Sequence, residues 1–355
     1  MSSLDELRST IKSLDEDIVD LVNERVQTAK KIGEIKQEKQ RPIKNYHVEQ
    51  QVINRFKDHA ESAGLLERTG EELAKILITE AVRGQEEDRR QANRKHDGDT
   101  YLIVGGEGNM GTWLSQFLQE GGAEVKTVDK SPEADYTSIP SLQGFDCVII
   151  STPVHITPTV ISELRKRGTN TVIADITSVK QPVAGELEQA AEAGLPVTSF
   201  HPMFDHTTTT LDGKNVVIAS LNDEEADSRI QSLFDETAAS VTTIPFDEHD
   251  DHIRHTLGLP HVISLVFGSV LSSTGMDKED LLRLGGTTFT EQTRATEQVF
   301  QENPDVYHAI QYYTEDNNAF NQIRETLEAV EEASNSDTPY KMRTLMKKGQ
   351  SFFEE

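Results

Sequence analysis

The sequence predicts a multidomain chain in which an α/β doubly wound domain lies between two all-helical domains. An apolar stripe at helical spacing runs without a break through about the first 35 residues. A short apolar strand, a glycine triplet and an amphipathic helix follow one another from residue 101 to residue 120, and a helical pattern returns after residue 246. The predicted boundaries are 1–90 for the first helical domain, 91–99 for a linker, 100–245 for the α/β domain and 246–355 for the second helical domain.

The composition is strongly acidic, with 61 acidic against 35 basic residues among 355 and a formal net charge of -26. This charge argues against nucleic acid and anionic membranes as partners. The acidic residues are spread along the chain, and a dispersed acidic surface is one way in which proteins stay soluble in concentrated salt. Our hypothesis is a halophilic source, and the alternative is an acidic enzyme of ordinary salt requirement.

Targeting signals and disulfides are not expected. The N-terminus MSSLDELRS is acidic, unlike a signal peptide, and the longest apolar stretch, Leu259 to Leu271, is too short to span a bilayer. The single cysteine, Cys147, lies in an apolar strand-like run, which predicts a buried thiol. We expect a cytoplasmic protein that contacts no membrane.

The first domain is predicted to contain three helices. Ser3-x-x-Glu6 is a capping box at the start of the first. This helix would be roughly 50 Å long, so its apolar stripe is expected to pair with another chain. Pro42 follows its end, a second helix is predicted over 47–63, and Thr69-x-x-Glu72 is expected to cap a third that reaches about residue 90.

Two basic residues on the first helix indicate an anionic ligand. Arg25 lies on the apolar seam, where a charge is costly unless it is paired, and Lys36 lies three turns later on nearly the same face. Arg8 lies roughly 25 Å from Arg25 along the helix, so it could join the same site only from an antiparallel partner chain. The alternative is a seam arginine paired with a neighbouring glutamate.

The α/β domain begins with the pattern of a dinucleotide site. Gly106-x-Gly108-x-x-Gly111 follows an apolar strand and opens a helix, and the next strand ends in Asp129. In such a site the glycines allow a tight turn, close approach of a pyrophosphate and close helix packing. Asp129 would accept hydrogen bonds from a ribose diol and repel a 2′-phosphate, which favours NAD over NADP. The alternative is a glycine-rich turn in an unrelated α/β domain.

Further strands are predicted at 147–150, 171–174, 197–200, 216–218 and 241–244. Ser178 and His201 follow two of them, and loops after parallel strands face the ligand cleft. A histidine there can take the proton from an alcohol while the carbon gives up hydride. Taken alone, His201 could equally be a hydrogen-bonded loop histidine without a catalytic role.

The last domain is predicted to be helical, with final helices over 304–333 and 338–353. His249, His252 and His255 recur every three residues, and His261 follows Pro260. That spacing would allow a metal site. We favour a polar helix start that faces the cleft and predict no metal, because no carboxylate or cysteine completes a ligand set.

The first ninety residues resemble the small helical chorismate mutases, which are intertwined dimers. The resemblance implies that Arg8 of the partner chain, Arg25 and Lys36 bind the dicarboxylate and the ether oxygen of chorismate. It also implies that Glu49 holds the substrate hydroxyl and that Glu86, in protonated form, lies near the ether oxygen.

Residues 100–355 resemble the prephenate dehydrogenases through the motifs GGEGNMG, STPVH, DITSVK and HPMF, in that order. The resemblance implies that His201 polarises the 4-hydroxyl of prephenate, that Ser178 bonds His201, and that His261 and Arg294 (in reserve Arg283) place the carboxylates. The implied cofactor-binding residues are Gly106, Gly108, Asn109, Met110, Gly111, Asp129, Thr152 and Pro153. The helical C-terminal domain is expected to complete the cleft and to form a dimer contact.

The whole chain therefore resembles the bifunctional chorismate mutase/prephenate dehydrogenases of the T-protein type, with NAD as cofactor and two small-molecule substrates. A first rival keeps the dehydrogenase and leaves the N-terminal helices for dimerisation or regulation, because Val48 and Asn45 replace residues common in the mutase family. A second rival is a non-catalytic NAD sensor. Arogenate in place of prephenate is the third open alternative.

Overall fold

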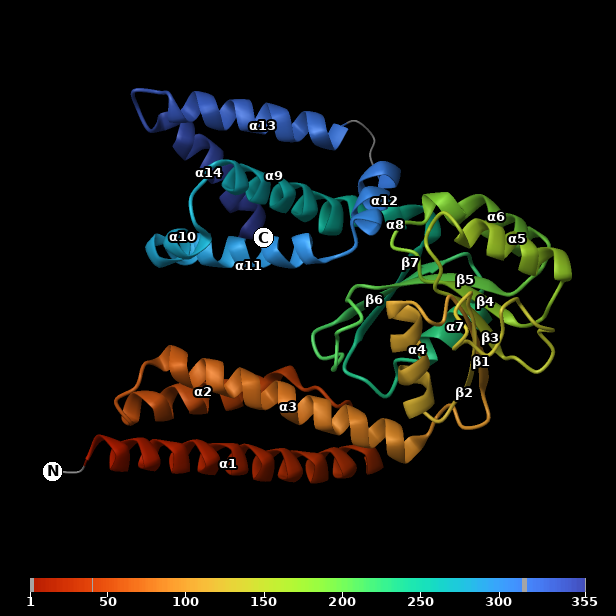
Figure 1. The fold of residues 1–355 in the computed structure, drawn as a ribbon, viewed down its shortest axis with the longest axis horizontal. Coiled ribbons are helices and arrows are strands. Elements are labelled where there is room, and N and C mark those ends of the chain that lie inside the picture. Colours follow the sequence, from red (N-terminus) through yellow and green to blue (C-terminus); the bar gives the residue numbers. More distant parts are fainter. Residues whose placement is uncertain (1–2, 40, 315–317, 355) are drawn as a thin grey trace. The chain divides into compact units, whose positions relative to one another are not determined.

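A computed structural model describes residues 3–39, 41–314 and 318–354. The first three helices are α1 (Leu4–Glu38), α2 (Tyr46–Ser62) and α3 (Glu67–Asn93), which pack side by side (Figure 1). The capping box is confirmed, since Glu6 N donates to Ser3 Oγ (3.2 Å) and Ser3 N donates to Glu6 Oε2 (2.7 Å). The predicted cap at Thr69 is wrong. Thr69 N already bonds Leu66 O (2.9 Å), so the helix begins two residues earlier.

The apolar stripe of α1 is largely exposed. Leu4 (64%), Ile11 (60%) and Leu21 (64%) keep more than half of their surface, whereas Val26 and Gly33, further along the helix, are buried. Helix α3 therefore covers the second half of α1 and leaves the apolar side chains of the first half uncovered.

The sheet has seven strands in the order β2-β1-β3-β4-β5-β6-β7. They are β1 (Thr100–Val104), β2 (Glu124–Val128), β3 (Cys147–Ile150), β4 (Val172–Asp175), β5 (Val197–Pro202), β6 (Asn215–Ser220) and β7 (Ser240–Pro245). All neighbours pair in parallel except β5 and β6, where Pro202 faces Val216 in an antiparallel register. The chain order reverses between β1 and β3, and the crevice at the carboxyl ends of these strands is where α/β sheets bind ligands.

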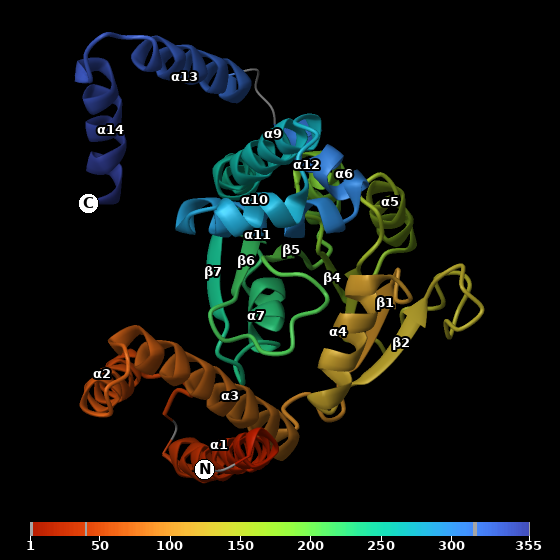
Figure 2. The same cartoon turned by 60° about the vertical axis from the view of Figure 1, so that its left-hand side comes forward.

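Helices cover both faces of the sheet (Figure 2). They are α4 (Asn109–Glu120), α5 (Thr157–Arg167), α6 (Gln181–Glu192) and α7 (Glu224–Ser232). Apolar residues of α4 and α7 join one buried cluster, and those of α5 and α6 join the other. Alternate residues of β1 contribute to the two clusters, so β1 is buried on both faces, as a parallel strand must be.

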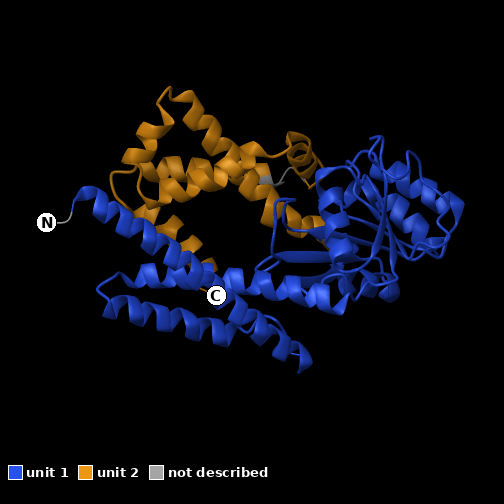
Figure 3. Cartoon of the chain, turned by 60° about the horizontal axis from the view of Figure 1, so that its bottom comes forward, with its two compact units in different colours: residues 1–247 blue, residues 248–355 orange. Residues whose placement is uncertain are grey.

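The chain divides into two compact units, residues 1–247 and 248–355 (Figure 3). The second unit is helical, with α8 (His249–Ile253), a π-helical turn η2 (Arg254–Gly258), α9 (Leu259–Ser273), α10 (Lys278–Leu284), α11 (Thr287–Gln301), α12 (Pro304–Thr314), α13 (Asn318–Ser334) and α14 (Tyr340–Phe353). The helix expected over 304–333 is thus described as two helices, α12 and α13; residues 315–317 between them lie outside the described residues.

A helical run from Phe246 to Ser273, which begins with the 3₁₀ turn η1 (Phe246–Glu248), is 28 residues long. By length and apolar composition it could cross a membrane, and 22% of its most apolar window is buried. The expectation that this region is too short is therefore corrected, because α8, η2 and α9 join into one helix. Length and composition do not separate a membrane helix from an apolar helix that another chain covers.

Candidate functional site

The glycine loop has the geometry expected of a phosphate-binding turn. Gly105 ends β1 at φ +86°, and a Cβ on Gly111 would lie 2.1 Å from Gly105 O, so helix α4 packs against the turn only because Gly111 has no side chain. A Cβ on Gly108 would meet only Gly105 O, at 3.4 Å. The N-terminus of α4, which begins with Asn109 and Met110, thus presents open backbone to an anion.

Asp129 follows β2 beside this loop. Its carboxylate accepts hydrogen bonds from the backbone of Glu107 (3.3 Å) and Lys130 (2.7 Å), which fix its orientation. Thr152 and Pro153 follow β3 across the switch point, and the Thr152 hydroxyl bonds the Thr157 hydroxyl (2.9 Å) at the start of α5. A helix start with glycine at its N-cap, an oriented carboxylate and a second loop at the same crevice fit a dinucleotide with a free ribose diol.

His201 lies at the carboxyl end of β5 and is 4% exposed. Ser178, in the loop after the neighbouring strand β4, is half-buried. The two residues therefore extend from adjacent parallel strands at the sheet edge where the glycine loop follows β1.

A buried lysine of the motif DITSVK, which is not among the predicted site residues, joins these two strand ends. Lys180 is 1% exposed, and its Nζ donates to Thr177 O (2.6 Å) and to Phe200 O (3.1 Å). Those carbonyls belong to the residues just before Ser178 and His201. Nζ also lies 3.6 Å from Oδ1 of the fully buried Asp175. The sequence signal for Lys180 is its position shortly after a strand that ends in the buried Asp175, a carboxylate that a nearby lysine can pair with.

In the helical domain, Arg25 and Lys36 are half-buried and bond backbone carbonyls. Arg25 Nη1 donates to Leu77 O and Lys36 Nζ to Ile43 O, each at 2.6 Å. Burial, then the nearby charge of Arg55, lowers the pKa of Arg25; burial and the charge of Arg89 lower that of Lys36. Partly buried cations that lie near further cations, Arg55 and Arg89, are suited to receive an anion.

Glu49, which belongs to α2, lies near Lys36 of α1. Burial raises the pKa of its carboxyl, although Lys44 and Lys36 act in the opposite direction. Lys44 Nζ lies 3.9 Å from Glu49 Oε2. The structure thus places Glu49 and Lys36 close enough for their charges to interact.

Glu86 has a different environment from the one expected. It is 6% exposed, and its carboxylate accepts hydrogen bonds from Thr210 Oγ1 (2.7 Å), Leu211 N (3.1 Å) and Ala238 N (2.6 Å) of the α/β domain. Burial raises the pKa of Glu86, although these three donors act in the opposite direction. Both side-chain oxygens are thus engaged by donors of the α/β domain. The assignment of Glu86 as a donor to an ether oxygen is therefore corrected.

Its neighbour Gln85 lies against α1. Gln85 Nε2 donates to Ala29 O (2.9 Å), and a Cβ on Gly33 would touch the Gln85 side chain at 2.7 Å. Ala29 and Gly33 lie on α1 between Arg25 and Lys36, and Gln85 Oε1 is buried without a partner among the described residues. Leu77, Ala81 and Gln85 follow one another at intervals of four residues and therefore lie on one face of α3. This spacing is the sequence signal that places Gln85, and not Glu86, on the face toward α1.

Arg8 lies near the start of α1, where its Nη1 is 3.6 Å from Asp5 Oδ1 and its side chain is 71% exposed. In the second unit, Arg294 pairs with Glu291 (3.7 Å) and Arg283 with Asp280 (2.5 Å), and both arginine side chains are more than 70% exposed. Substrate contacts of these arginines stay predictions.

His261 lies inside the second unit. Its ring is 9% exposed and its centroid is 4.2 Å from that of Tyr307, while Nδ1 has no hydrogen-bond partner among the described residues. Burial lowers the pKa of His261 to about 4. At neutral pH the ring is therefore uncharged, and it can contribute a neutral hydrogen bond but no cation to a carboxylate.

This lowered pKa predicts acid sensitivity of the fold. An unfolded histidine binds a proton below about pH 6.5, whereas folded His261 does so only near pH 4, so the free energy of unfolding falls as pH drops between these values. We expect a loss of roughly 1–3 kcal/mol from this residue. Urea unfolding of wild type and His261→Asn at pH 7 and pH 4.5 measures it; equal pH dependence in the two proteins would contradict the assignment.

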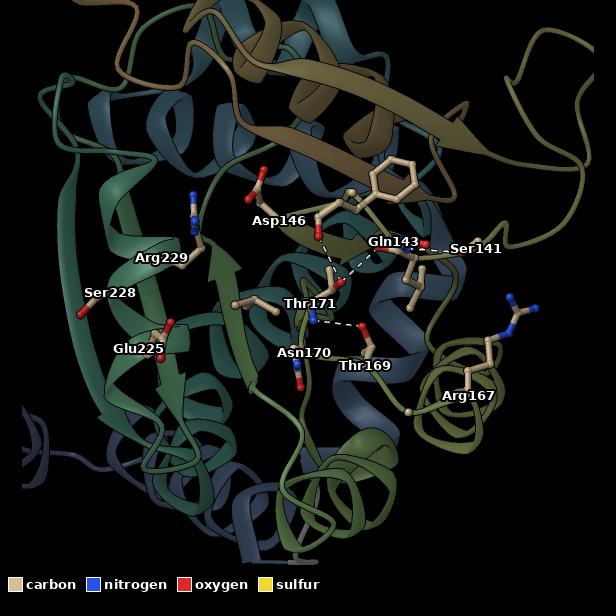
Figure 4. A pocket seen from close by; sticks show the side chains of 15 residues that line it. Ser141, Gln143, Asp146, Arg167, Thr169, Asn170, Thr171, Glu225, Ser228 and Arg229 are labelled. Carbon is tan, nitrogen blue, oxygen red and sulfur yellow. Dashed lines mark hydrogen bonds between the residues drawn. The ribbon is translucent and has the colours of Figure 1, made fainter.

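A cavity of about 900 Å³ opens at the opposite edge of the sheet, beside the amino ends of β3 and β4 (Figure 4). Its arginines are already engaged: Arg229 Nη1 donates to Asp99 (3.0 Å), and Arg167 Nη1 donates to the backbone carbonyls of Ile139 and Pro140 (2.9 Å each). Ligand sites of α/β sheets lie at the carboxyl edge, so the glycine loop and His201 remain the candidate site. Within the described residues no group of three or more His, Cys, Asp or Glu side chains could hold a metal ion.

Comparisons with known families match the chain in three consecutive segments. Residues 7–86 match type II chorismate mutase, residues 116–242 match the nucleotide-binding domain of prephenate dehydrogenase, and residues 245–348 match its dimerization domain. The chain is 27% identical over 318 residues to the T-protein of Enterobacter agglomerans, covering 89% of this chain and 84% of that protein. It is 26% identical to the T-protein of Haemophilus influenzae, over 86% and 80% of the two proteins.

Solved structures share the fold. Prephenate dehydrogenase from A. aeolicus, in complex with hydroxyphenyl propionate and NAD⁺, superposes with a TM-score of 0.57 at 20% identity over 72% of this chain and 98% of that one. Arogenate dehydrogenase from Synechocystis gives 0.55 at 16% identity, over 72% and 99%.

Proposed function

Because the chain belongs to the bifunctional chorismate mutase/prephenate dehydrogenases, we propose here which of its residues carry each reaction. The protein is an isomerase that rearranges chorismate to prephenate and an NAD-dependent oxidoreductase that converts prephenate to 4-hydroxyphenylpyruvate, in tyrosine biosynthesis. The observation that carries this conclusion is the presence in one chain of the three matched domains in the order of the T-proteins.

The mutase site consists of Arg25, Lys36, Glu49 and Gln85 of one chain and Arg8 of the partner chain. The rearrangement is pericyclic and needs no nucleophile, so the residues act by holding the compact conformer and stabilising developing negative charge on the ether oxygen. Lys36 belongs to α1, and the Gln85 amide packs against α1 at Ala29 and Gly33. Both donate hydrogen bonds to the ether oxygen. Glu49 accepts the substrate hydroxyl.

The shifted pKa values predict a bell-shaped pH profile for the mutase. The pKa of Glu49 is raised, so the carboxylate is lost at a higher pH than for an ordinary glutamate; that of Lys36 is lowered, so its cation is lost at a lower pH than for an ordinary lysine. We expect kcat/KM for chorismate to fall on both sides of neutrality. Glu49→Gln should flatten the acid limb only; an unchanged acid limb would exclude Glu49 as its cause.

In the dehydrogenase site, NAD, when bound, would supply the acceptor for the hydride that leaves C4 of prephenate. The glycine loop and Asp129 hold the cofactor, with Asn109, Met110, Thr152 and Pro153 beside it. His201 takes the proton of the 4-hydroxyl as the carbinol carbon is oxidised, and Ser178 orients the imidazole. Loss of carbon dioxide from C1 makes the ring aromatic, which drives the reaction. His261 and Arg294 serve the carboxylates.

The decisive experiment uses purified protein with chorismate, first without and then with NAD. Prephenate formed without NAD, followed by NADH and 4-hydroxyphenylpyruvate when NAD is added, is the expected result. Failure to form prephenate would favour the rival in which the N-terminal helices only dimerise or regulate. Prephenate and arogenate offered separately with NAD then decide between the two dehydrogenase substrates, and we propose prephenate.

The remaining assignments are a homodimer in the cytoplasm and the domain boundaries 1–90, 100–245 and 246–355 with a linker at 91–99. The uncovered apolar stripe of α1 and the match to a dimerization domain support the dimer.

We also propose that the acidic surface is an adaptation to salt. With a net charge of -26, repulsion between carboxylates opposes the compact fold, and it is screened more strongly as the salt concentration rises. Both activities and the unfolding temperature are expected to rise when NaCl is increased from about 0.1 M, where the Debye length is about 10 Å, to about 1 M. Full activity and an unchanged unfolding temperature in dilute buffer would indicate an ordinary acidic enzyme.

A further inference from the structure

The loop of residues 203–214, which we call the post-histidine loop, starts two residues after His201. It returns as β6, whose Val217 pairs with His201 itself. Whatever fixes this loop therefore fixes the backbone on both sides of the imidazole.

On one side the loop is held by the cofactor helix. Trp113 of α4 donates from Nε1 to Thr208 O (2.9 Å), and its ring packs edge-to-face on Phe204 with centroids 5.0 Å apart. Helix α4 begins at the glycine loop, so Trp113 links the post-histidine loop to the element that receives the cofactor.

On the other side the loop is held by the helical domain. Glu86 accepts from Thr210 Oγ1 and Leu211 N, and its second oxygen accepts from Ala238 N just before β7. Lys44 adds a second attachment, since its Nζ lies 2.6 Å from Asp212 Oδ1. Leu211 is 3% exposed and packs into the core of the α/β domain, so the carboxylate contacts a well-fixed end of the loop.

We propose that Glu86 is a positioning residue for the dehydrogenase reaction, which it serves by fixing the post-histidine loop, and that it has no part in the mutase reaction. This rests on the proposed function of His201. A carboxylate bonded by three donors is strongly seated, and a small displacement of a catalytic group can cost a large factor in rate.

The test exploits the fact that Trp113 is the only tryptophan in the chain, so its emission reports on the loop directly. Glu86→Gln keeps the shape of the side chain but replaces one acceptor oxygen by a donor that faces N–H or O–H groups. Glu87→Gln is the matched control, because Glu87 is adjacent on α3, half-exposed, and pairs only weakly with Lys30 (4.0 Å) and Arg83 (3.7 Å). Thr210→Val removes one donor, and Thr210→Ser restores it.

For Glu86→Gln we expect kcat for prephenate oxidation to fall about tenfold, with the Kd for NAD and the mutase rate without NAD unchanged within about twofold, and Trp113 emission to shift. Thr210→Val should act in the same direction more weakly, and Thr210→Ser and Glu87→Gln should match wild type. If Glu86→Gln does not fold, the two Thr210 variants test the proposal by the same kinetic and emission measurements.

Wild-type kcat and emission in Glu86→Gln, or equal kcat and emission in Thr210→Val and Thr210→Ser, would overturn the proposal. A mutase loss larger than the dehydrogenase loss would also overturn it and return Glu86 to the mutase site. If wild-type protein does not oxidise prephenate, the proposed function fails, whereas the emission of the variants still decides whether Glu86 fixes the loop.

Discussion

Replacement of His201 by alanine is expected to lower kcat for prephenate oxidation by about 10²- to 10⁴-fold. The imidazole lies at the carboxyl end of β5 and is 4% exposed, so water reaches this position poorly as a replacement proton acceptor. NADH formation from prephenate at saturating NAD measures the effect, and prephenate formation from chorismate in the same preparation should be unchanged. If high pH restored the rate of the variant, hydroxide would be replacing the imidazole as the acceptor of the 4-hydroxyl proton.

The control for this experiment is His59→Ala, since His59 is an exposed histidine in the last turn of α2. The Kd for NAD, measured by quenching of Trp113, should be the same in all three proteins. A His201→Ala variant that binds NAD normally and still oxidises prephenate at the wild-type rate would exclude His201 as the base.

Replacement of Lys180 by methionine is expected to give the largest loss of stability. Methionine fills a similar volume, but it leaves the fully buried Asp175 carboxylate without the ammonium 3.6 Å away. Breaking a buried pair by removing one partner typically costs about 3–5 kcal/mol in the free energy of unfolding. Denaturant unfolding measures the loss.

The double variant Lys180→Met/Asp175→Asn separates charge from packing. It should recover much of the lost stability, because the uncompensated charge is gone, yet it should remain impaired in dehydrogenation. The ammonium also donates to the carbonyl oxygens of Thr177 and Phe200, the residues that directly precede Ser178 and His201. A loss below about 1 kcal/mol in Lys180→Met would show that the two hydrogen bonds from Thr177 stabilise the buried Asp175 side chain without the ammonium.

The glycine loop and the strand ends could be predicted from sequence because their signals are local. Gly111 must be small wherever a helix crosses the turn this closely, and Asp129 ends the next strand whatever surrounds the domain. The same holds for the capping box at Ser3 and Glu6, where both bonds lie within four residues.

The sequence predictions are wrong where the surroundings of a residue depend on packing against segments that are distant in the chain. Glu86 and Gln85 are adjacent, and only the packing of α3 between α1 and the α/β domain determines that Gln85 lies against Ala29 while Glu86 bonds Thr210. Thr69 is a residue type that commonly caps helices, but α3 already begins at Glu67, with Leu66 at the N-cap. The apolar stretch Leu259–Leu271 is short by itself, but a π-helical turn joins it to α8, so that the helical run extends from Phe246 to Ser273.

The exposed stripe of α1 also bears on how the enzyme comes into being. Its first half is exposed in the single chain, and Arg8, which we propose to reach the mutase site of a partner chain, lies in that same half. Under that proposal a single chain lacks one cation of the mutase site. Dilution below the Kd of the proposed dimer is therefore expected to lower the rate of chorismate rearrangement.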